Sequence, residues 1–492
     1  MNLIDSVLMQ LAPSRAAKRI RDRIRAQALM NYDAAKPGRR TDAWRAPRSS
    51  ADGAAINSRE TLRNLSRDFV RNRPWAARVR DVVTVNVVAS GIRPSVECKD
   101  PEVKEAVERV IRSFLLSTAI DARRRQSLFQ MQATAMNAVF ADGEVLVRQR
   151  MRNRNFEKDL ALPFQVELIE VDHLDMAKTS HGNNEVIEGL EYGPTGRVEA
   201  YHLFRHHPAE IAFWRKGARV ESERVPAAQI LHLYRQDRPG QMRGVPWLAP
   251  VMLTLGEISD YQEAQILKQK MAALMAGVVT TDAEGATFRG AGLEELHPGA
   301  LVGLEPGQKI EWTNPPQVEA YDEFMRAALG AVAMGVGITY EALSGDLRQV
   351  NFSSGRMGRM EMDRLVEQWQ HLILIAQFCE GIARWFKDSW ALQAGRREND
   401  IPAGEFEIRW TAPRRPLIDP VKEIGAMVAE VEGGLSSTQR QQRRLGYDPE
   451  EIDQERADDA ARGRGGVVRP TAAAPTDDDD ETDNGGPRNE RD

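Results

Sequence analysis

Cysteines, aromatic side chains and long apolar runs are all scarce in this chain of 492 residues. Its two cysteines, Cys98 and Cys379, are too few for a disulfide framework or a cysteine-ligated metal site, so we expect buried thiols in a reducing compartment. No apolar run approaches the ~20 residues that span a bilayer. The first residues also lack the basic region and cleavage site of a secretory signal. We therefore expect assembly in the cytoplasm and no membrane contact.

Signatures of catalysis are missing as well. The chain has no GxxxxGK[ST] phosphate-binding loop, so any ATP-driven activity would come from another protein. Its eight histidines include no HExxH pair, and His206 and His207 precede Pro208 in a turn with no carboxylate at metal spacing. The glycines at 335–337 close a helical pattern, whereas a dinucleotide fingerprint follows a strand. We predict a protein that is not an enzyme and holds no cofactor or metal.

One local cluster keeps an enzymatic alternative open. Asp172, His173 and Asp175 lie close together in the sequence and offer the ligand types of a metal-dependent nuclease. A nuclease site also needs an acidic residue from a distant part of the chain, and the sequence alone identifies none.

The charges are unevenly distributed along the chain. The formal net charge of the whole is −5, but residues 1–80 carry +11, residues 461–492 carry −3 and the remaining body carries −13. An acidic body argues against a domain that grips DNA through many phosphates, and it fits a conduit through which DNA slides. Composition alone favours the other interpretation, an ordinary acidic soluble protein. The basic residues at 15–25 form either a contact for nucleic acid or an acidic partner, or a solvated arm.

Apolar periodicity predicts an α+β chain. Helices are expected over 56–89, with a break at Pro74, and over 100–140. Leu62, Leu65 and Phe69 share one face of the first helix. The arginines at 59, 63, 67 and 71 form a stripe on another face, directed either at an acidic neighbouring subunit or at solvent. Short strands are expected at 144–150, 164–170, 186–192, 198–204, 210–214 and 229–234.

Longer helical patterns fill the second half. One starts at Pro246, a favoured first-turn residue, and runs to Ala276, and the next covers 319–335. The residues between them suit a compact insert or a decorated helical hairpin. A helix over 354–390 should bury one apolar face: Leu365, Trp369, Leu372, Ile373, Ala376, Cys379, Ala383 and Phe386. A strand at 405–410 follows.

The last part of the chain is expected to be helical over 417–460, with a break at Gly433-Gly434 and a cap at Ser436. Beyond residue 461 the chain is rich in Gly, Pro, Ala and Asp, and residues 477–481 are all acidic. Such a segment lacks the apolar residues for a core and should be disordered. It either keeps the protein soluble or binds a partner.

The most informative stretch is 335–358, which joins two helical patterns through a polar loop. Gly335 and Gly337 end the first pattern, and residues 346–351 form a turn-rich polar run. Ser353 or Ser354 can then cap the next helix. A long helix launched from an exposed loop suggests a part of a larger assembly instead of a pocket wall.

This stretch resembles the tunnel-loop region of tailed-phage portal proteins of the lambda-like family. Further segments resemble that family in the same order along the chain: 32–35 (YDAA), 38–40 (GRR), Trp44, 62–74 (LRNLSRDFVRNRP), 86–91 (NVVASG), 232–234 (HLY), 238–241 (RPGQ) and 243–250 (RGVPWLAP). Together they cover the chain from about residue 30 to 455, so a chance agreement in order is improbable.

The resemblance implies a portal-protein fold that assembles as a ring, dodecameric in mature particles. Its expected parts are a basic arm (1–50), an α/β wing (51–245), a stem helix (246–276), a small α/β clip (277–318), a second stem helix (319–343), an inward tunnel loop (344–353), a long helix with the rest of the wing (354–412), a helical crown (413–460) and an acidic tail (461–492).

The resemblance also implies the function: a channel at one capsid vertex through which double-stranded DNA is packaged and later ejected. The implied partners are further copies of the chain, the terminase large subunit, the major capsid protein and the head-completion or connector proteins, with a scaffold as a further candidate. Within the tunnel loop, Arg348, Gln349 and Asn351 are the candidate DNA contacts, unless these polar residues only cap and connect helices. A monomeric capsid adaptor is the other alternative.

Overall fold

The computed structural model describes residues 48–153, 157–210, 221–274, 278–281, 308–311, 321–394, 402–413, 417 and 419–463, together with Lys18 and Arg39. The basic segment at 15–25 apart from Lys18, nearly all of the expected strand at 210–214, most of the expected clip and the acidic run at 477–481 lie outside these residues. Among the described helices, none combines the length and the apolar composition needed to cross a membrane.

The chain divides into two compact units. The first comprises Met1–Asn57 with Arg238–Gln241, and the second comprises Ser58–Asp237 with Met242–Asp492. In the first unit, the short helix α3 (Ala51–Ala55) is capped by the hydroxyl of Ser50, which accepts a bond from the Gly53 N–H. The guanidinium of Arg238 donates to the Ser49 carbonyl at 3.1 Å.

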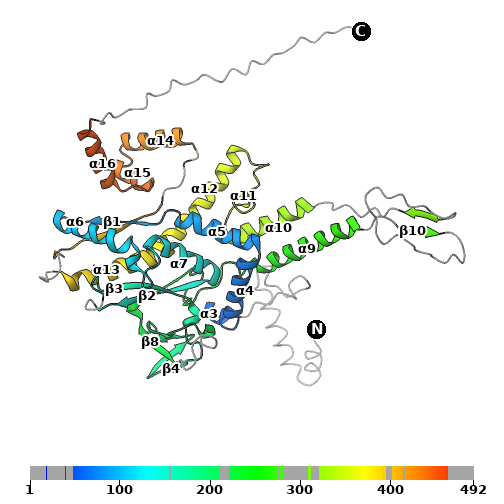
Figure 1. The fold of residues 1–492 in the computed structure, drawn as a ribbon, viewed down its shortest axis with the longest axis horizontal. Coiled ribbons are helices and arrows are strands. Elements are labelled where there is room, and N and C mark those ends of the chain that lie inside the picture. Colours follow the sequence, from blue (N-terminus) through cyan, green and yellow to red (C-terminus); the bar gives the residue numbers. More distant parts are fainter. Residues whose placement is uncertain are drawn as a thin grey trace, which may run out of the picture. The chain divides into compact units, whose positions relative to one another are not determined.

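The second unit mixes helices and strands, which confirms the α+β prediction (Figure 1). Its α-helices are α4 (Arg59–Asn72), α5 (Pro74–Val88), α6 (Pro101–Val110), α7 (Leu128–Asp142), α9 (Met252–Leu274), α10 (Tyr321–Val336), α11 (Tyr340–Ser344), α12 (Phe352–Trp369), α13 (Glu380–Gln393), α14 (Pro420–Glu432), α15 (Thr438–Arg444) and α16 (Pro449–Ala461). The π-helical and 3₁₀ segments are η2 (Ile111–Leu115), η3 (Thr118–Ile120), η4 (Val171–His173), η5 (Ala227–Gln229) and η6 (Gln370–Cys379).

The strands within the described residues form four antiparallel sheets. They are β1 (Arg93–Glu97) with β12 (Glu407–Thr411); β10 (Val278–Thr281) with β11 (Gln308–Glu311); β3 (Phe164–Ile169), β2 (Glu144–Met151) and β9 (Ile230–Tyr234); and β4 (Ser180–His181), β5 (Asn184–Ile187), β6 (Leu190–Tyr192), β7 (Val198–Phe204) and β8 (Ser222–Pro226). The predicted strand at 186–192 is two strands, because Glu188 and Gly189 adopt positive φ angles of 50° and 81° and turn the chain between them.

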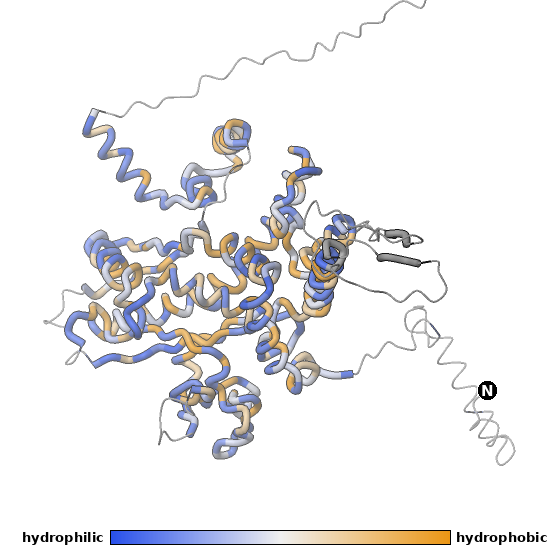
Figure 2. Tube along the Cα trace, turned by 45° about the vertical axis from the view of Figure 1, so that its right-hand side comes forward, coloured by the Kyte–Doolittle hydropathy of each residue, from blue (hydrophilic) through white to orange (hydrophobic). Residues whose placement is uncertain are grey.

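The sheet β3-β2-β9 lies between two apolar cores. Successive side chains of a strand point to opposite faces, so Val145 and Val147 of β2 enter one core and Leu146 enters the other. The larger core is formed with α5, α7 and the long helix, and Figure 2 shows apolar positions concentrated where helices and strands meet. The smaller core joins this sheet to the five-stranded sheet through Leu190 and Tyr201.

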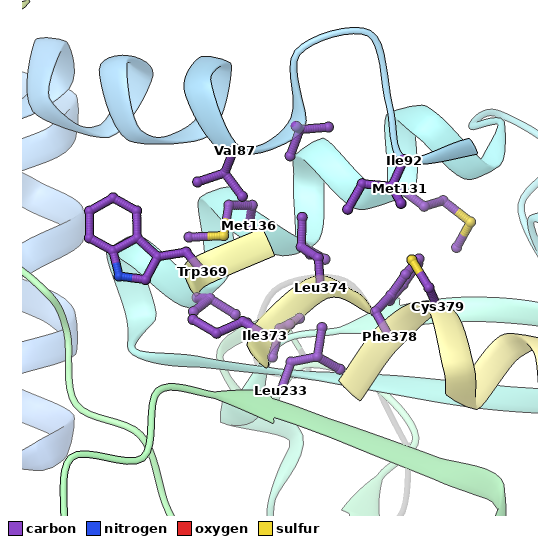
Figure 3. Packing of buried hydrophobic residues seen from close by; sticks show 14 of the residues in the cluster. Val87, Ile92, Met131, Met136, Leu233, Trp369, Ile373, Leu374, Phe378 and Cys379 are labelled. Atoms are coloured by element: carbon purple, nitrogen blue, oxygen red, sulfur yellow. The ribbon is translucent and has the colours of Figure 1, made fainter. Parts of the chain in front are cut away.

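The long helix begins two residues earlier than predicted and runs from Phe352 to Gln393, with η6 as a π-helical stretch in its middle. The π-helix has more residues per turn than an α-helix, so it changes which residues face the core. Leu374 and Phe378 are buried, while Leu372 is 57% exposed and Ala376 is exposed, contrary to the prediction. Figure 3 shows Met131 and Met136 of α7 turned toward this buried face.

The helix predicted to begin at Pro246 begins instead at Met252. Residues 246–251 form tight turns, in which the Ala249 and Val251 N–H groups bond to the carbonyls of Pro246 and Leu248. Pro250 disfavours helical backbone at the residue before it, which explains the delayed start. Trp247 is buried there, and its backbone N–H donates to the Phe140 carbonyl in the last turn of α7.

The predicted break at Pro74 between two helices is confirmed, but the faces of α4 are not as expected. Leu65 is 44% exposed, whereas Arg59 and Arg63 of the arginine stripe are 1% and 4% exposed. The stripe therefore faces neither solvent nor a neighbouring subunit at these positions. Its arginines pair within the chain: Arg59 with Glu188, and Arg63 with Asp172 at 3.0 Å.

In the last three helices the Gly433-Gly434 break is confirmed, because α14 ends at Glu432 and α15 begins at Thr438. The N-cap of α15 is Ser437 instead of Ser436: its hydroxyl accepts a bond from the Arg440 N–H at 3.2 Å. The hydroxyl of Ser436 instead accepts a hydrogen bond from the side-chain amide of Gln441.

Candidate functional site at the loop between α11 and α12

Two glycines define how the chain enters this loop. Gly337 has φ +89° at the end of α10, and a side chain there would also come within 3.1 Å of Leu365. Thr339 caps α11 by accepting a bond from the Ala342 N–H. Gly345 ends α11 with φ +71°, and its N–H bonds to the Glu341 carbonyl at 2.8 Å. Both positions favour glycine because other residues rarely adopt such angles.

Asp346 organises the loop itself. Its carboxylate accepts two bonds from the Arg348 guanidinium, at 2.9 and 3.0 Å, and one from the Arg348 backbone N–H at 3.1 Å. These bonds lower the pKa of Asp346 to about 2. The Arg348 side chain is nevertheless 77% exposed. The loop therefore presents an ion pair to solvent, with no net charge from these two residues.

The other two predicted contact residues are engaged within the chain. Gln349 accepts a hydrogen bond through its side-chain oxygen from Arg326 of α10, and Arg326 also lies 3.9 Å from Asp346. Sequence reasoning missed Arg326, which comes from another helix; no local signal marks it. Arg348 is thus the only cation within the loop, but a second one borders it.

Asn351 is the N-cap of α12, a role that the sequence reading gave to Ser353 or Ser354. Its side-chain oxygen accepts a bond from the Ser354 N–H at 2.8 Å, and the Ser354 hydroxyl accepts one from the Asn351 N–H at 3.1 Å. This reciprocal pair satisfies backbone donors that the helix start leaves without partners. Asn351 therefore has a structural function that any DNA contact would have to share.

Apolar side chains lie beside these polar ones. Leu347 in the loop is 66% exposed, Phe352 is 62% exposed, and Met357 and Met360 of α12 are 72% and 49% exposed. Exposed apolar side chains that gather on a surface often mark a site where a partner binds, so these four residues are candidates for such a contact.

The residues of the nuclease alternative do not form a metal site. Asp172 accepts bonds from Arg63 at 3.0 Å and from Arg67 at 2.7 Å. His173 bonds through Nδ1 to the Phe204 carbonyl, and Asp175 accepts a bond from the Ser222 hydroxyl. The three side chains thus have separate partners, and positive charge already occupies Asp172.

The fold brings together two other groups of metal-binding residue types. One is Glu170, Asp172 and His207, which corrects the expectation that His207 has no carboxylate nearby: its Nε2 lies 3.6 Å from Glu170. The other is His181, Glu191 and His202. In each group an arginine is bonded to a carboxylate. Arg67 donates to Asp172 at 2.7 Å, and Arg224 donates two bonds to Glu191 at 2.8 and 3.0 Å. Bonding by Arg224 lowers the pKa of Glu191 to about 2.

Comparison with known proteins places the chain in a family. A family model described as "Phage portal protein, lambda family" matches residues 37–370. The chain is 24% identical over 470 residues to a probable portal protein of Halomonas phage phiHAP-1, covering 90% of this chain and 89% of that one. It is 20% identical over 486 residues to portal protein B of Escherichia phage lambda, covering 88% and 89%.

Among solved structures, one determined as the neck of a native GTA particle with C12 symmetry is 13% identical. Its TM-score is 0.48, and the match covers 80% of this chain and 94% of that one. Because the family model covers well over half of the sequence, and relatives that carry the portal name align over about nine-tenths of it, the chain belongs to the lambda family of phage portal proteins.

Proposed function

We propose that the protein forms a ring-shaped channel at one vertex of a viral capsid, through which double-stranded DNA is packaged and later ejected. The ring would also be the docking site for the terminase large subunit and for head-tail connector proteins, and would contact the major capsid protein and a scaffold. The observation that carries this proposal is membership of a portal family, whose members are structural and not catalytic, over residues 37–370.

Exposed apolar side chains on the long helices support closed self-association. On α9, Leu253 is 84% exposed and Leu267 is 58% exposed, and on α10 Met334 is 82% exposed. Tyr261 of α9 stacks on Tyr321 of α10 with ring centroids 5.8 Å apart, so these two helices pack on each other and still carry outward apolar groups. Such groups are buried if copies of the chain contact one another, and a repeated head-to-tail contact closes into a ring.

The loop between α11 and α12 suits weak contact with moving DNA. Arg348 is exposed, but its Nε and Nη2 already donate to the Asp346 carboxylate, so a phosphate competes with that carboxylate for the guanidinium. The carboxylate then remains close by and repels the phosphate. Each contact is therefore short-lived, which lets a ring of loops centre a duplex while the duplex slides.

Counting subunits tests the proposal directly. Native mass spectrometry and negative-stain imaging of the purified chain, alone and with its coat and scaffolding proteins, should give closed rings. Isolated globules under both conditions would exclude a channel and favour the monomeric adaptor. Divalent-metal-dependent cleavage of DNA by the pure ring would favour the nuclease instead, although Asp172 is held by Arg63 and Arg67.

A further inference from the structure

A cleft of about 790 Å³ is lined by residues of α4, α7 and the strands β2 and β3, far along the sequence from the proposed DNA loop. Seven arginines and four carboxylates line it, a net charge of +3 with its three histidines neutral. Most of these arginines come from different elements, so the concentration of positive charge is a product of the fold.

Three of the arginines in the lining already have carboxylate partners. Arg67 donates to both oxygens of Asp142 at 2.7 Å and to Asp172, and Arg150 lies 3.1 Å from Glu167. Arg148 contacts Glu223 at 3.3 Å, yet its buried Nε has no hydrogen-bond partner among the described atoms.

Two arginines at the cleft have no such partner. The guanidinium groups of Arg71 on α4 and Arg205 after β7 make no hydrogen bond or ion pair with any residue that the structure describes. A third, Arg123, is 72% exposed, and its ion pair with Glu167 is long, at 3.8 Å. These groups are available to an anionic ligand, and three of the four carboxylates in the lining, Asp142, Glu167 and Glu170, already have arginine partners within the chain.

The shape of the cleft selects the kind of anion. A hollow of this volume admits a side-chain-sized or peptide-sized group, whereas a rigid duplex presents its phosphates along a convex surface. Guanidinium groups bind carboxylates through two parallel hydrogen bonds, and several separate arginines suit several carboxylates on a flexible strand. An acidic peptide meets both requirements better than DNA does.

The chain carries one such peptide. Residues 477–481, DDDDE, are the longest run of consecutive acidic residues in the sequence. Thirteen residues separate the run from Gly463, the last residue of the described part, and a chain of that length reaches up to about 45 Å.

We propose that the arginine cleft binds the acidic run at 477–481, of the same chain or of a neighbouring copy. Tethering gives the run an effective concentration of about 1 mM, so a Kd of about 100 µM for the free peptide would keep the cleft roughly nine-tenths occupied. The run would then compete with other acidic segments for the cleft, for example those of proteins that meet the portal.

The test measures how tightly the full chain binds a labelled peptide of residues 475–483, with fluorescence anisotropy as the readout. In one variant the run is neutralised (D477N, D478N, D479N, D480N and E481Q). In this variant the chain's own run no longer competes for the cleft, so the variant should bind the peptide about tenfold more tightly than the natural chain does. In the same background, Arg71→Glu with Arg205→Glu should weaken binding at least about fivefold, since each reversal replaces an attraction with a repulsion. The matched control, Arg109→Glu on α6 with Arg112→Glu on η2, should not weaken binding.

Three results would overturn the proposal: equal affinity for the natural and neutralised chains, equal effects of the cleft and control variants, or equal binding of the amide peptide PTNNNNQTN. Inorganic phosphate and a DNA duplex serve as competing probes, and tighter, cleft-dependent binding of either would assign the site to phosphate. Native mass spectrometry of the same samples reports ring formation separately, so a failure here leaves the channel proposal untouched.

Discussion

At the scale of single residues, the carboxylate of Glu144 is a buried charge that its bonding partners stabilise. Glu144 is fully buried and accepts bonds from Arg243 at 2.7 Å and from His232 at 2.8 Å. Burial alone would raise the pKa of Glu144, but the charge of Arg243 and the bonds from His232 and Arg243 outweigh it and hold the pKa well below its usual range. Removing one partner of a buried pair costs about 3–5 kcal/mol, because the other charge is left uncompensated.

We therefore expect Glu144→Gln to lower the free energy of unfolding at pH 7 by about 3–5 kcal/mol, measured by urea denaturation. A depressed pKa stabilises the folded state above the ordinary value of 4.5, and this stabilisation is lost as the pH falls from there toward the folded-state pKa. The difference between natural and variant proteins should thus be constant from pH 7 to about 5.5 and shrink below pH 4.5. Glu105→Gln, at an exposed position, is the control and should change little; a pH-independent difference down to pH 3 would contradict the assignment.

The ion pair in the loop gives a second prediction for single residues. If the Asp346 carboxylate competes with phosphate for Arg348, then Asp346→Asn should strengthen the phosphate contact and Arg348→Ala should remove it. We expect D346N to retain DNA longer in filled particles and R348A to retain it for a shorter time, with DNA per particle as the measurement. Asp81→Asn, which breaks a similar exposed pair with Arg80, serves as the control. Unchanged packaging and retention in both loop variants would remove the pair from the mechanism.

The residue scale is also where the sequence was least informative. The spacing of the arginines at 59, 63, 67 and 71 identified a stripe, but spacing cannot show what faces it. Its partners Asp142, Asp172 and Glu188 come from three distant segments that the fold brings to α4. The predicted loop of 345–351 was found where glycines and a polar run marked it, whereas Arg326 enters the site from α10 without any local sign.

At the scale of elements, some local sequence signals were sufficient to predict where helices begin and end. Pro74, Gly345 and the Gly433-Gly434 pair act through the backbone of their own neighbourhood, so their effect could be read from the sequence. The π-helical segment η6 could not, because its register depends on how the long helix packs against α7 and β9. The pairing of β1 with β12 joins segments more than three hundred positions apart and has no local signature either.

Asn351 links an element to the proposed function, and two substitutions separate its roles. Asn351→Ala should remove the cap of α12 and cost about 1 kcal/mol, visible as faster hydrogen exchange in the first turn of that helix. Asn351→Asp should preserve the cap, because aspartate caps as well as asparagine does, and add a negative charge near the DNA path. We expect Asn351→Asp to reduce the amount of DNA packaged, with no change in hydrogen exchange of the first turn of α12. If only the alanine variant affects packaging, Asn351 acts on the helix alone.

At the scale of the whole molecule, the exposed apolar face of α9 makes the assembly testable without disturbing the subunit. Leu253 and Leu267 are 84% and 58% exposed, so replacing both with glutamate removes little buried surface, and glutamate suits a helix. Substitutions at such positions usually change subunit stability by no more than about 0.5 kcal/mol each. In a ring, the same two positions would place unpaired charges in every subunit contact, and a penalty repeated at each contact prevents closure.

We therefore expect Leu253→Glu with Leu267→Glu to yield a folded subunit with unchanged circular dichroism but no rings by native mass spectrometry. Leu253→Met with Leu267→Met, which keeps the face apolar, should form rings as the natural chain does. Rings of the glutamate variant at the same subunit concentration would show that this face lies outside the contact, and the exposed group of Leu347, Phe352, Met357 and Met360 would be the next surface to test. A variant that also loses its circular dichroism signal would show that the leucines support the subunit itself, contrary to their exposure.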